Sequence, residues 1–346
     1  AAFMNECCCP SCQKLMREQG LNPAKKEDRQ EFARWTYYDM VRDLTAFAKK
    51  YNPDFHVCYN KGHLGYLDKP VKEDYSYFSF ESLPGVEWGY LDFPVSAKYM
   101  RNFGKECLGL TSRFHTEWGD FHAFRNEAAM EYEVFSMLAH GCKCTIGDQM
   151  DYWGKLNTDM YKQIGRVYKS VEEKEPWCEN AKPISEIGVF TAEEFYATGV
   201  AGHIPGASEG VARLLMELGY QFDFIDSTLD FDKYRLLILP DVIPVDEELR
   251  DKLSTYLKKG GKLLVSYQSG LDRAHQKFMI PELAVVYKGE APYSPDFIWP
   301  KEHLSKDLAD AEHVMYDKGT LVEATDEAVF VQKVIPPVFN RTYEHF

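Results

Sequence analysis

The sequence has few basic residues for its number of acidic ones. Its 40 lysines and arginines stand against 54 aspartates and glutamates, which gives a net charge of −14. Nucleic acids and anionic membrane surfaces attract basic proteins, so we expect neither as a partner. No apolar run reaches the roughly 20 residues that a membrane-spanning helix needs. The chain also lacks internal repeats and low-complexity segments, and its 346 residues favour two or three folded domains.

Several enzyme motifs are absent as well. There is no His-x-His and no His-Glu-x-x-His, which argues against a metal-dependent hydrolase. No Gly-x-Gly-x-x-Gly occurs, so a dinucleotide cofactor is not expected. Ser266-Tyr267-Gln268-Ser269-Gly270 is not a Gly-x-Ser-x-Gly nucleophile elbow. No cysteine follows Cys178, which excludes the cysteine nucleophile of class I amidotransferases from the second half of the chain.

The nine cysteines do not form the pattern of a disulfide framework. Four of them cluster between positions 7 and 12, and the others are scattered along the chain. Cys58, Cys142 and Cys144 fall in apolar runs, where cysteine acts as a small hydrophobic residue. A reducing compartment, the cytoplasm, is therefore the expected location.

Segments of strand length alternate with helical patterns in the first half of the chain. Strands are predicted at residues 55–59, 75–80, 107–111 and 142–146, after a first strand that ends at Glu6. Helices are predicted at 26–51, 94–103, 124–139 and 159–173, and this alternation is typical of a parallel sheet. A complete (β/α)8 barrel needs ~250 residues. We therefore interpret residues 1–176 as the C-terminal part of a TIM-type catalytic barrel.

A polar, proline-bounded stretch at 173–183 then predicts a linker. Residues 184–275 show strands at 187–190, 222–225, 236–239 and 263–267 with helices at 207–218 and 247–259. This order is typical of a flavodoxin-like or class I amidotransferase-like α/β domain. Residues 276–346 carry short strand-like runs and are expected to form part of a β-rich C-terminal segment. The predicted fold class is thus α/β throughout the first two domains.

Polar residues end each predicted strand of the barrel region. They are Glu6, Asn60, Glu81, Arg113 and Asp148. The chemistry of barrel enzymes takes place at the C-terminal ends of the strands, so these positions predict a site there.

Two of these strand ends offer candidate catalytic carboxylates. Glu6 follows Asn5, so the pair could protonate a glycosidic oxygen and bind a sugar hydroxyl, or Glu6 could instead sit at the entry of the next helix. Glu81 is followed by a Pro-Gly turn and by Trp88 and Tyr90. These rings could wall a sugar site, or they could pack within a surface loop.

The densest polar and aromatic run is residues 111–120. In an extended segment Arg113, His115 and Glu117 would share a face, next to Trp118. A carboxylate beside an arginine stays ionised, which suits a nucleophile or base. The alternative is an ion-paired loop. Asp148, at the last strand end, could bind substrate hydroxyls or cap the next helix.

Cys7-x-Cys9-x-x-Cys12 has a spacing that could hold one tetrahedral Zn²⁺ together with a fourth ligand from elsewhere. Such a closed thiolate site would be structural, so no cofactor is expected to be required for catalysis. The alternative is a set of reduced thiols in the turn that begins a helix.

The order of the segments resembles that of the family 42 β-galactosidases with their trimerisation domain. A barrel strand comes first, then a Cys-x-Cys-Pro-x-Cys cluster, further β/α units and a cysteine-free amidotransferase-like domain. The sequence looks still more like the related alpha-L-fucosidase-like barrel hydrolases. The segments that carry this second resemblance are Phe80-Glu81-Ser82-Leu83-Pro84, Trp118-Gly119-Asp120-Phe121, Ile146-Gly147-Asp148-Gln149 and Phe339-Asn340-Arg341-Thr342.

The resemblance implies a retaining exo-glycosidase that removes a terminal sugar, an alpha-L-fucoside or a beta-D-galactoside. It also implies a structural zinc on Cys7, Cys9 and Cys12, and a homo-oligomer, a trimer or dimer. In family 42 the Asn-Glu acid lies several residues before the cysteine cluster, whereas Glu6 adjoins it here. Glu117 lies near the strand end where family 42 keeps its nucleophile. The catalytic candidates are therefore Glu117, Glu81 and Glu6, and the alternative function is an inactive carbohydrate-binding barrel protein.

Overall fold

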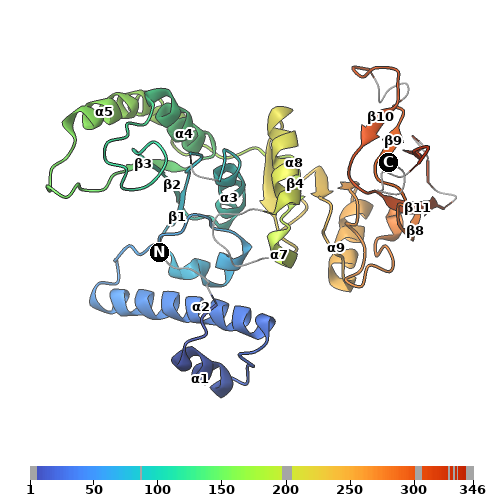
Figure 1. The fold of residues 1–346 in the computed structure, drawn as a ribbon, viewed down its shortest axis with the longest axis horizontal. Coiled ribbons are helices and arrows are strands. Elements are labelled where there is room, and N and C mark those ends of the chain that lie inside the picture. The colour runs from blue at the N-terminus through green and yellow to red at the C-terminus, as the bar shows by residue number, and fades with distance from the viewer. Residues whose placement is uncertain are drawn as a thin grey trace. The chain divides into compact units, whose positions relative to one another are not determined.

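The molecule consists of two compact units, Ala1–Leu229 and Asp230–Phe346 (Figure 1). This computed structural model describes residues 6–85, 88–196, 205–300, 306–325, 328–329, 332 and 334–339. The first unit contains the sheet that carries most of the candidate site residues. The domain limits expected from the sequence, at residues 176, 184 and 275, stay predictions.

The first unit contains a parallel sheet of strands β1 (Phe78–Glu81), β2 (Cys107–Ser112) and β3 (Lys143–Gly147), in the order β1-β2-β3. Glu81 pairs with Leu110, and Ser112 pairs with Gly147, so the C-terminal ends of the three strands lie at one end of the sheet. We call this the site end. Among the described residues the sheet is open and forms no closed ring. The predicted α/β class with parallel strands is confirmed.

The segment before β1 lies beside it but forms no regular strand, contrary to the prediction for residues 55–59. The Gly62 carbonyl accepts a hydrogen bond from Glu81 N at 2.8 Å, and Lys61 forms a single parallel bridge with Phe80. Farther back, Val57 N donates to the Ser76 hydroxyl at 2.9 Å. Ser76 N in turn donates to the Val57 carbonyl at 2.8 Å, so one backbone bond and one side-chain bond join the two segments there. The segment still brings Asn60 to the site end.

Helices from the β/α units cover the sheet. α3 (Asp92–Met100) packs against β1 and β2 and is buried along its whole length, and the short η2 (Arg101–Phe103) extends it. α4 (Glu127–Ala139) packs against β2 and β3 and against α5 (Thr158–Glu172). The core between α4 and α5 consists of Met130, Val134, Met160, Ile164, Val167 and Val171. α2 (Lys26–Tyr51) has the bounds that the sequence predicts.

Both α4 and α5 begin at an asparagine cap. The Asn126 side chain accepts a hydrogen bond from Ala128 N at 2.8 Å, and the Asn157 side chain accepts one from Met160 N at 3.1 Å. Each cap satisfies a helix-terminal N–H group that has no partner inside its helix. These caps fix where the loops at the site end stop and the helices start.

A second parallel pair belongs to the same unit. β4 (Ile187–Phe190) and β5 (Phe222–Ile225) pair in register, with Ile187 opposite Phe222. All eight positions are buried, as in a strand pair covered on both faces. The one charged residue among them, Asp223, accepts a hydrogen bond from Arg101 Nε at 2.9 Å. The helix α8 (Gly206–Glu217) and the strand β5 both contact α3, while α7 (Glu193–Tyr196) contacts the short helix η1 (Tyr66–Asp74).

The second unit begins with β6 (Leu236–Leu239) and β7 (Lys262–Val265), which pair in parallel on either side of α9 (Glu247–Lys258) in the sequence. The Asp246 carboxylate caps α9 by accepting a hydrogen bond from Leu249 N at 3.0 Å. Short antiparallel strands follow, in agreement with the predicted β-rich segment. They are β8 (Val285–Glu290) with β11 (Thr320–Ala324), and β9 (Asp296–Ile298) between β10 (His313–Met315) and β12 (Val334–Ile335), after the short helix η3 (Pro281–Leu283).

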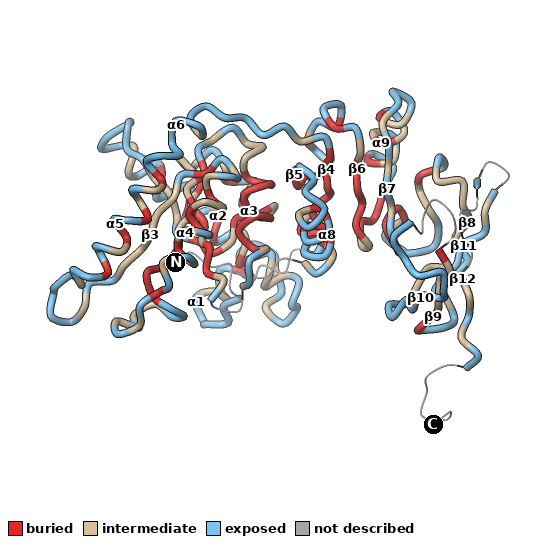
Figure 2. The backbone as a smooth tube through the Cα atoms, turned by 90° about the horizontal axis from the view of Figure 1, so that it is seen from above, coloured by how far each residue is buried: buried red, intermediate tan, exposed pale blue. Residues whose placement is uncertain are grey.

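Buried residues concentrate in α3 and along β4, β5 and β6 (Figure 2). The loops at the site end are exposed by comparison, apart from a few charged side chains described below. None of the helices in the described part of the chain is long and apolar enough to cross a membrane.

Candidate active site

Glu81 is the C-terminal residue of β1, and its carboxyl group is half-buried. Burial raises the pKa of this carboxyl, while a hydrogen bond from the Asn60 side chain acts in the opposite direction. A carboxyl whose pKa lies above the usual value keeps its proton to higher pH, which is the property of a general acid. The sequence predicts both residues as site residues, and the structure brings them together.

Trp88 closes over the neighbouring segment. A Cβ atom on Gly62 would lie 2.3 Å from Cη2 of the Trp88 ring, so only glycine allows this approach. Trp88 is half-buried and therefore lies at the strand ends that carry Asn60 and Glu81. Tyr90 lies elsewhere: its exposed ring makes an edge contact with Tyr132 of α4, with the ring centroids 5.1 Å apart.

Arg113 and Asp148 form an ion pair between the ends of β2 and β3. The Arg113 guanidinium is buried and stacks on the Phe114 ring, 4.2 Å from its centroid. Its Nη1 atom has no hydrogen-bond partner among the described residues. Asp148 also accepts a hydrogen bond from Gln149 N at 2.7 Å, and Tyr161 of α5 donates one to it.

The segment that follows Arg113 bends repeatedly, so the common face expected for an extended Arg113-x-His115-x-Glu117 does not form. Arg113 is drawn into the protein by Asp148, whereas His115 and Glu117 are exposed. Trp118 turns back onto the sheet, where a Cβ on Gly147 would lie 2.6 Å from its ring. Two tryptophans, Trp88 and Trp118, thus pack on glycines at opposite sides of the site end.

Glu6 lies outside this group. Its carboxylate accepts a hydrogen bond from Arg29 Nε of α2 at 2.8 Å, and Asn5 lies outside the described residues. The structure therefore brings together Asn60 with Glu81, and Arg113 with Asp148. Among the described residues the Glu117 carboxylate makes no hydrogen bond or ion pair with either pair. The catalytic roles of Glu117, Glu81 and Glu6 stay predictions.

The three cysteines predicted to bind zinc lie together at the start of α1 (Pro10–Glu18). Their sulfur atoms are all within 4.8 Å of one another. Cys9 caps the helix, and its Sγ accepts a hydrogen bond from Cys12 N at 3.5 Å, which lowers the pKa of the Cys9 thiol to about 7. Around a tetrahedral Zn²⁺ with Zn–S bonds of about 2.3 Å, sulfur atoms lie roughly 4 Å apart. The cluster therefore fits three of four zinc ligands, and no fourth group joins it among the described residues.

The sequence reasoning missed a buried histidine next to the site end. His63 Nε2 lies 2.6 Å from Glu193 Oε1 of α7, and its Nδ1 lies 2.6 Å from Ser96 Oγ of α3. The chain after His63 forms η1 at residues 66–74, and the Asp68 carboxylate accepts a hydrogen bond from Gly65 N at 3.1 Å at the start of this helix. Only the alternation of buried and polar residues around Pro70 could have indicated this helix.

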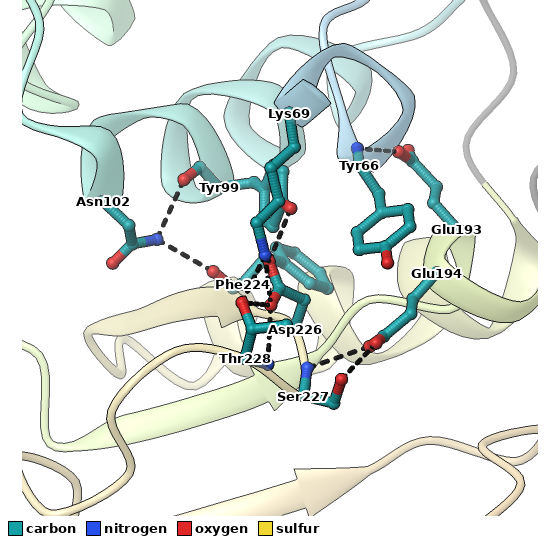
Figure 3. A network of polar contacts seen from close by, with 10 residues as sticks. All are labelled: Tyr66, Lys69, Tyr99, Asn102, Glu193, Glu194, Phe224, Asp226, Ser227 and Thr228. Carbon is teal, nitrogen blue, oxygen red and sulfur yellow. Dashed lines mark hydrogen bonds and ion pairs between the residues drawn. The ribbon is translucent and has the colours of Figure 1, made fainter. Parts of the chain in front are cut away.

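A second network ties η1 to β5 (Figure 3). Lys69 Nζ lies 2.8 Å from both carboxylate oxygens of Asp226, and Tyr99 of α3 donates to the same carboxylate at 2.8 Å. Asp226 is fully buried, so these donors and Thr228 offset the cost of burying its charge. Glu193 also accepts from Tyr66 N at 3.0 Å. The loop that positions Asn60 is thus held to α7 and β5 of the same unit.

Comparison with known proteins explains this arrangement. Residues 213–283 match the family model of the beta-galactosidase trimerisation domain. The structure is similar to alpha-L-fucosidase isoenzyme 2 from Paenibacillus thiaminolyticus, with a TM-score of 0.91 and 34% identity over 99% of this chain and 52% of that one. The resemblance expected from the sequence motifs is confirmed.

More distant proteins share the fold. A beta-galactosidase from Bacillus circulans sp. alkalophilus matches 92% of this chain and 52% of its own, with a TM-score of 0.72 at 13% identity. Beta-galactosidase GanA of Bacillus subtilis (strain 168) is 22% identical over 215 residues, which are 57% of this chain and 32% of GanA. The chain therefore spans about half the length of the two structures and a third of GanA.

Proposed function

We propose that the protein is a glycoside hydrolase that removes a terminal sugar by a two-carboxylate, retaining mechanism. The observation that carries the proposal is Glu81. It is a half-buried carboxyl group of raised pKa at the C-terminal end of a parallel strand, in a chain that is similar over nearly its whole length to an alpha-L-fucosidase. An alpha-L-fucoside is the first proposed substrate, and a beta-D-galactoside is the second.

Glu81 would act as the general acid, since burial keeps its proton available for the leaving oxygen. Glu117 would act as the nucleophile, with Glu6 as the other candidate carboxylate. A retaining mechanism requires the two carboxyl groups ~5–5.5 Å apart, and an inverting one ~6.5–9.5 Å.

The remaining polar groups at the site end would hold the sugar. Asn60 and Asp148 offer an amide and a carboxylate to its hydroxyls, and the unpaired Nη1 of Arg113 offers a donor. A buried donor without a protein partner calls for one from elsewhere. Trp88 and Trp118 would wall the site, and His115 would approach from the exposed loop.

A homo-oligomer, a trimer or dimer, is proposed because residues 213–283 match the model of the beta-galactosidase trimerisation domain. A structural Zn²⁺ on Cys7, Cys9 and Cys12 is proposed from the sulfur cluster. A cytoplasmic location is proposed because all nine cysteines are free thiols.

The second candidate function is carbohydrate binding without catalysis. The exposure of Glu117, away from the Arg113–Asp148 pair, is the observation that favours it. In that case the site end would keep its aromatic and hydrogen-bonding groups but lack a second carboxylate at the required distance.

The test is hydrolysis of aryl alpha-L-fucosides and aryl beta-D-galactosides by the protein expressed from its whole gene. Glu117→Gln should lose several orders of magnitude in rate, because an amide cannot form the covalent intermediate. Glu248→Gln, at an exposed position of α9, serves as the matched control. Activity of Glu117→Gln equal to that of the wild type would remove Glu117 from the mechanism. No turnover on the whole panel would favour the binding function.

A further inference from the structure

The loop between β3 and α5 exposes an unusual group of apolar side chains. In residues 148–157, Tyr152 and Trp153 are each 73% exposed, Met150 is 69% exposed and Leu156 is 56% exposed. Scattered single apolar residues on a surface need no explanation, but four within seven positions form a patch. A patch of this kind on a folded protein usually marks a binding site.

The loop has a defined turn. The Asp151 carboxylate accepts hydrogen bonds from Trp153 N at 2.9 Å and from Lys155 N at 3.1 Å, and Gly154 N donates to the Asp151 carbonyl at 3.0 Å. Gly154 adopts a positive φ of 66°, which closes the turn. The two rings pack on each other with centroids 5.0 Å apart and planes at 46°. The turn therefore presents a preformed aromatic pair to solvent.

Both ends of the loop are anchored at the candidate active site. It starts at Asp148, which is paired with Arg113, and it ends at the first turn of α5, where Tyr161 donates a hydrogen bond to the same Asp148 carboxylate. The aromatic pair is thus joined at both ends to the side chain that is proposed to bind a sugar hydroxyl.

We infer that Tyr152 and Trp153 form a platform for the neutral sugar that is linked to the terminal one, on the leaving-group side of the bond that breaks. This inference rests on the proposed glycosidase function. The flat faces of aromatic rings match the C–H faces of a pyranose, and rings of this size supply large contact areas. Residues 149–157 contain two charged side chains, Asp151 and Lys155, whose charges are opposite and sum to zero. The surface therefore suits an uncharged ligand.

The size of the patch argues against a second copy of the chain as the occupant. A stable protein interface buries about 800 Å² on each partner, far more than two rings and two aliphatic side chains on one turn provide. A single sugar ring, in contrast, is covered by one or two aromatic side chains.

The test compares two substrates of the same terminal sugar in the wild type and in Tyr152→Ala, Trp153→Ala and the double variant. One is 2′-fucosyllactose, which has a sugar leaving group, and the other is alpha-L-fucosyl fluoride, which has none. The inference predicts a loss of kcat/KM of about tenfold or more for 2′-fucosyllactose in the double variant, the size of effect expected for an interface anchor, and little change for the fluoride. Trp177→Ala removes another highly exposed tryptophan, on α6 (Glu175–Cys178), and is the matched control.

A separate measurement distinguishes failure of this inference from failure of the proposed function. Titration calorimetry with lactose and with 2′-fucosyllactose reports binding even if the protein hydrolyses neither fucoside. Weaker binding of both sugars by the double variant, but not by Trp177→Ala, would support the platform without any turnover. Unchanged binding and equal losses on both substrates would overturn it. So would a change in sedimentation that shows the patch to be an interface between copies.

Discussion

His63 and Glu193 form a buried ion pair whose atoms Nε2 and Oε1 lie 2.6 Å apart. The histidine belongs to the loop that carries Asn60 to the site end, and the glutamate is the first residue of α7. Burial alone would lower the pKa of His63, but the charge and hydrogen bond of Glu193 raise it to about 9. The stability of this loop is therefore linked to pH.

We expect His63→Gln to lower the free energy of unfolding by about 3 kcal/mol, because removing one partner leaves the other charge buried. His63 has a higher pKa in the folded protein than its usual value of 6.5. The decrease in unfolding free energy caused by His63→Gln should therefore have its full size below about pH 6.5 and should shrink as the pH rises through about 9. Urea unfolding of the wild type and the variant between pH 6 and 10 measures the difference. A difference that stays constant or grows with pH would contradict this assignment, and His122→Gln, at an exposed position, is the control.

Arg113 should contribute to stability as well as to sugar binding. In Arg113→Met the carboxylate of Asp148, whose side chain is 10% exposed, would lose its counter-ion. We expect a loss of about 3–5 kcal/mol. In Arg166→Met the broken pair with Glu127 is exposed and screened by solvent, so the expected loss is far smaller. Urea unfolding midpoints of the two variants test this contrast. Equal decreases in unfolding free energy would show that the buried pair stabilises the fold no more than the exposed one.

Zinc should accompany the purified protein. Elemental analysis without chelator is expected to give about one zinc per chain, and Cys9→Ser to remove most of it. Cys8→Ser is the matched control, because Cys8 lies in the same run but outside the sulfur cluster. Protein with no zinc, or equal zinc in both variants, would end the proposal of a metal site at the start of α1.

Asn60 should influence the pKa of the Glu81 carboxyl group. Its hydrogen bond lowers the pKa of Glu81, so Asn60→Ala should raise that pKa further. If Glu81 is the general acid, the alkaline limb of the kcat/KM profile reports its loss of a proton and should move to higher pH in the variant. A limb that stays in place, or moves to lower pH, would show that another group controls it.

The bounds of some helices and strands can be predicted from the local sequence. The strands at 187–190, 222–225 and 236–239 and the helix at 26–51 have the predicted bounds, because long apolar runs and a sustained helical period leave little choice. The segment at 55–59 is not a regular strand: between Val57 and Ser76 one hydrogen bond joins the two backbones and the other goes to the Ser76 hydroxyl. No local pattern contains that long-range contact.

The candidate site shows the same limit. That Asn60, Glu81, Arg113 and Asp148 end strands can be predicted from the sequence, and parallel pairing then brings them to one end of the sheet. The bend after Arg113 cannot be predicted, because it depends on an ion pair with a residue 35 positions away. His63 was missed for the same reason: its partners, Ser96 and Glu193, are 33 and 130 positions distant.

The measurement that tests the central claim most directly is the effect of Glu81→Gln on two leaving groups. A general acid is needed for a sugar leaving group and not for fluoride. The proposed mechanism predicts a loss of about 10²–10⁴ in kcat/KM on 2′-fucosyllactose and a near-normal kcat/KM on alpha-L-fucosyl fluoride, because kcat/KM reports the first step and not the second, in which the same residue acts as base. Wild-type rates on both substrates would contradict it and remove Glu81 from the chemistry.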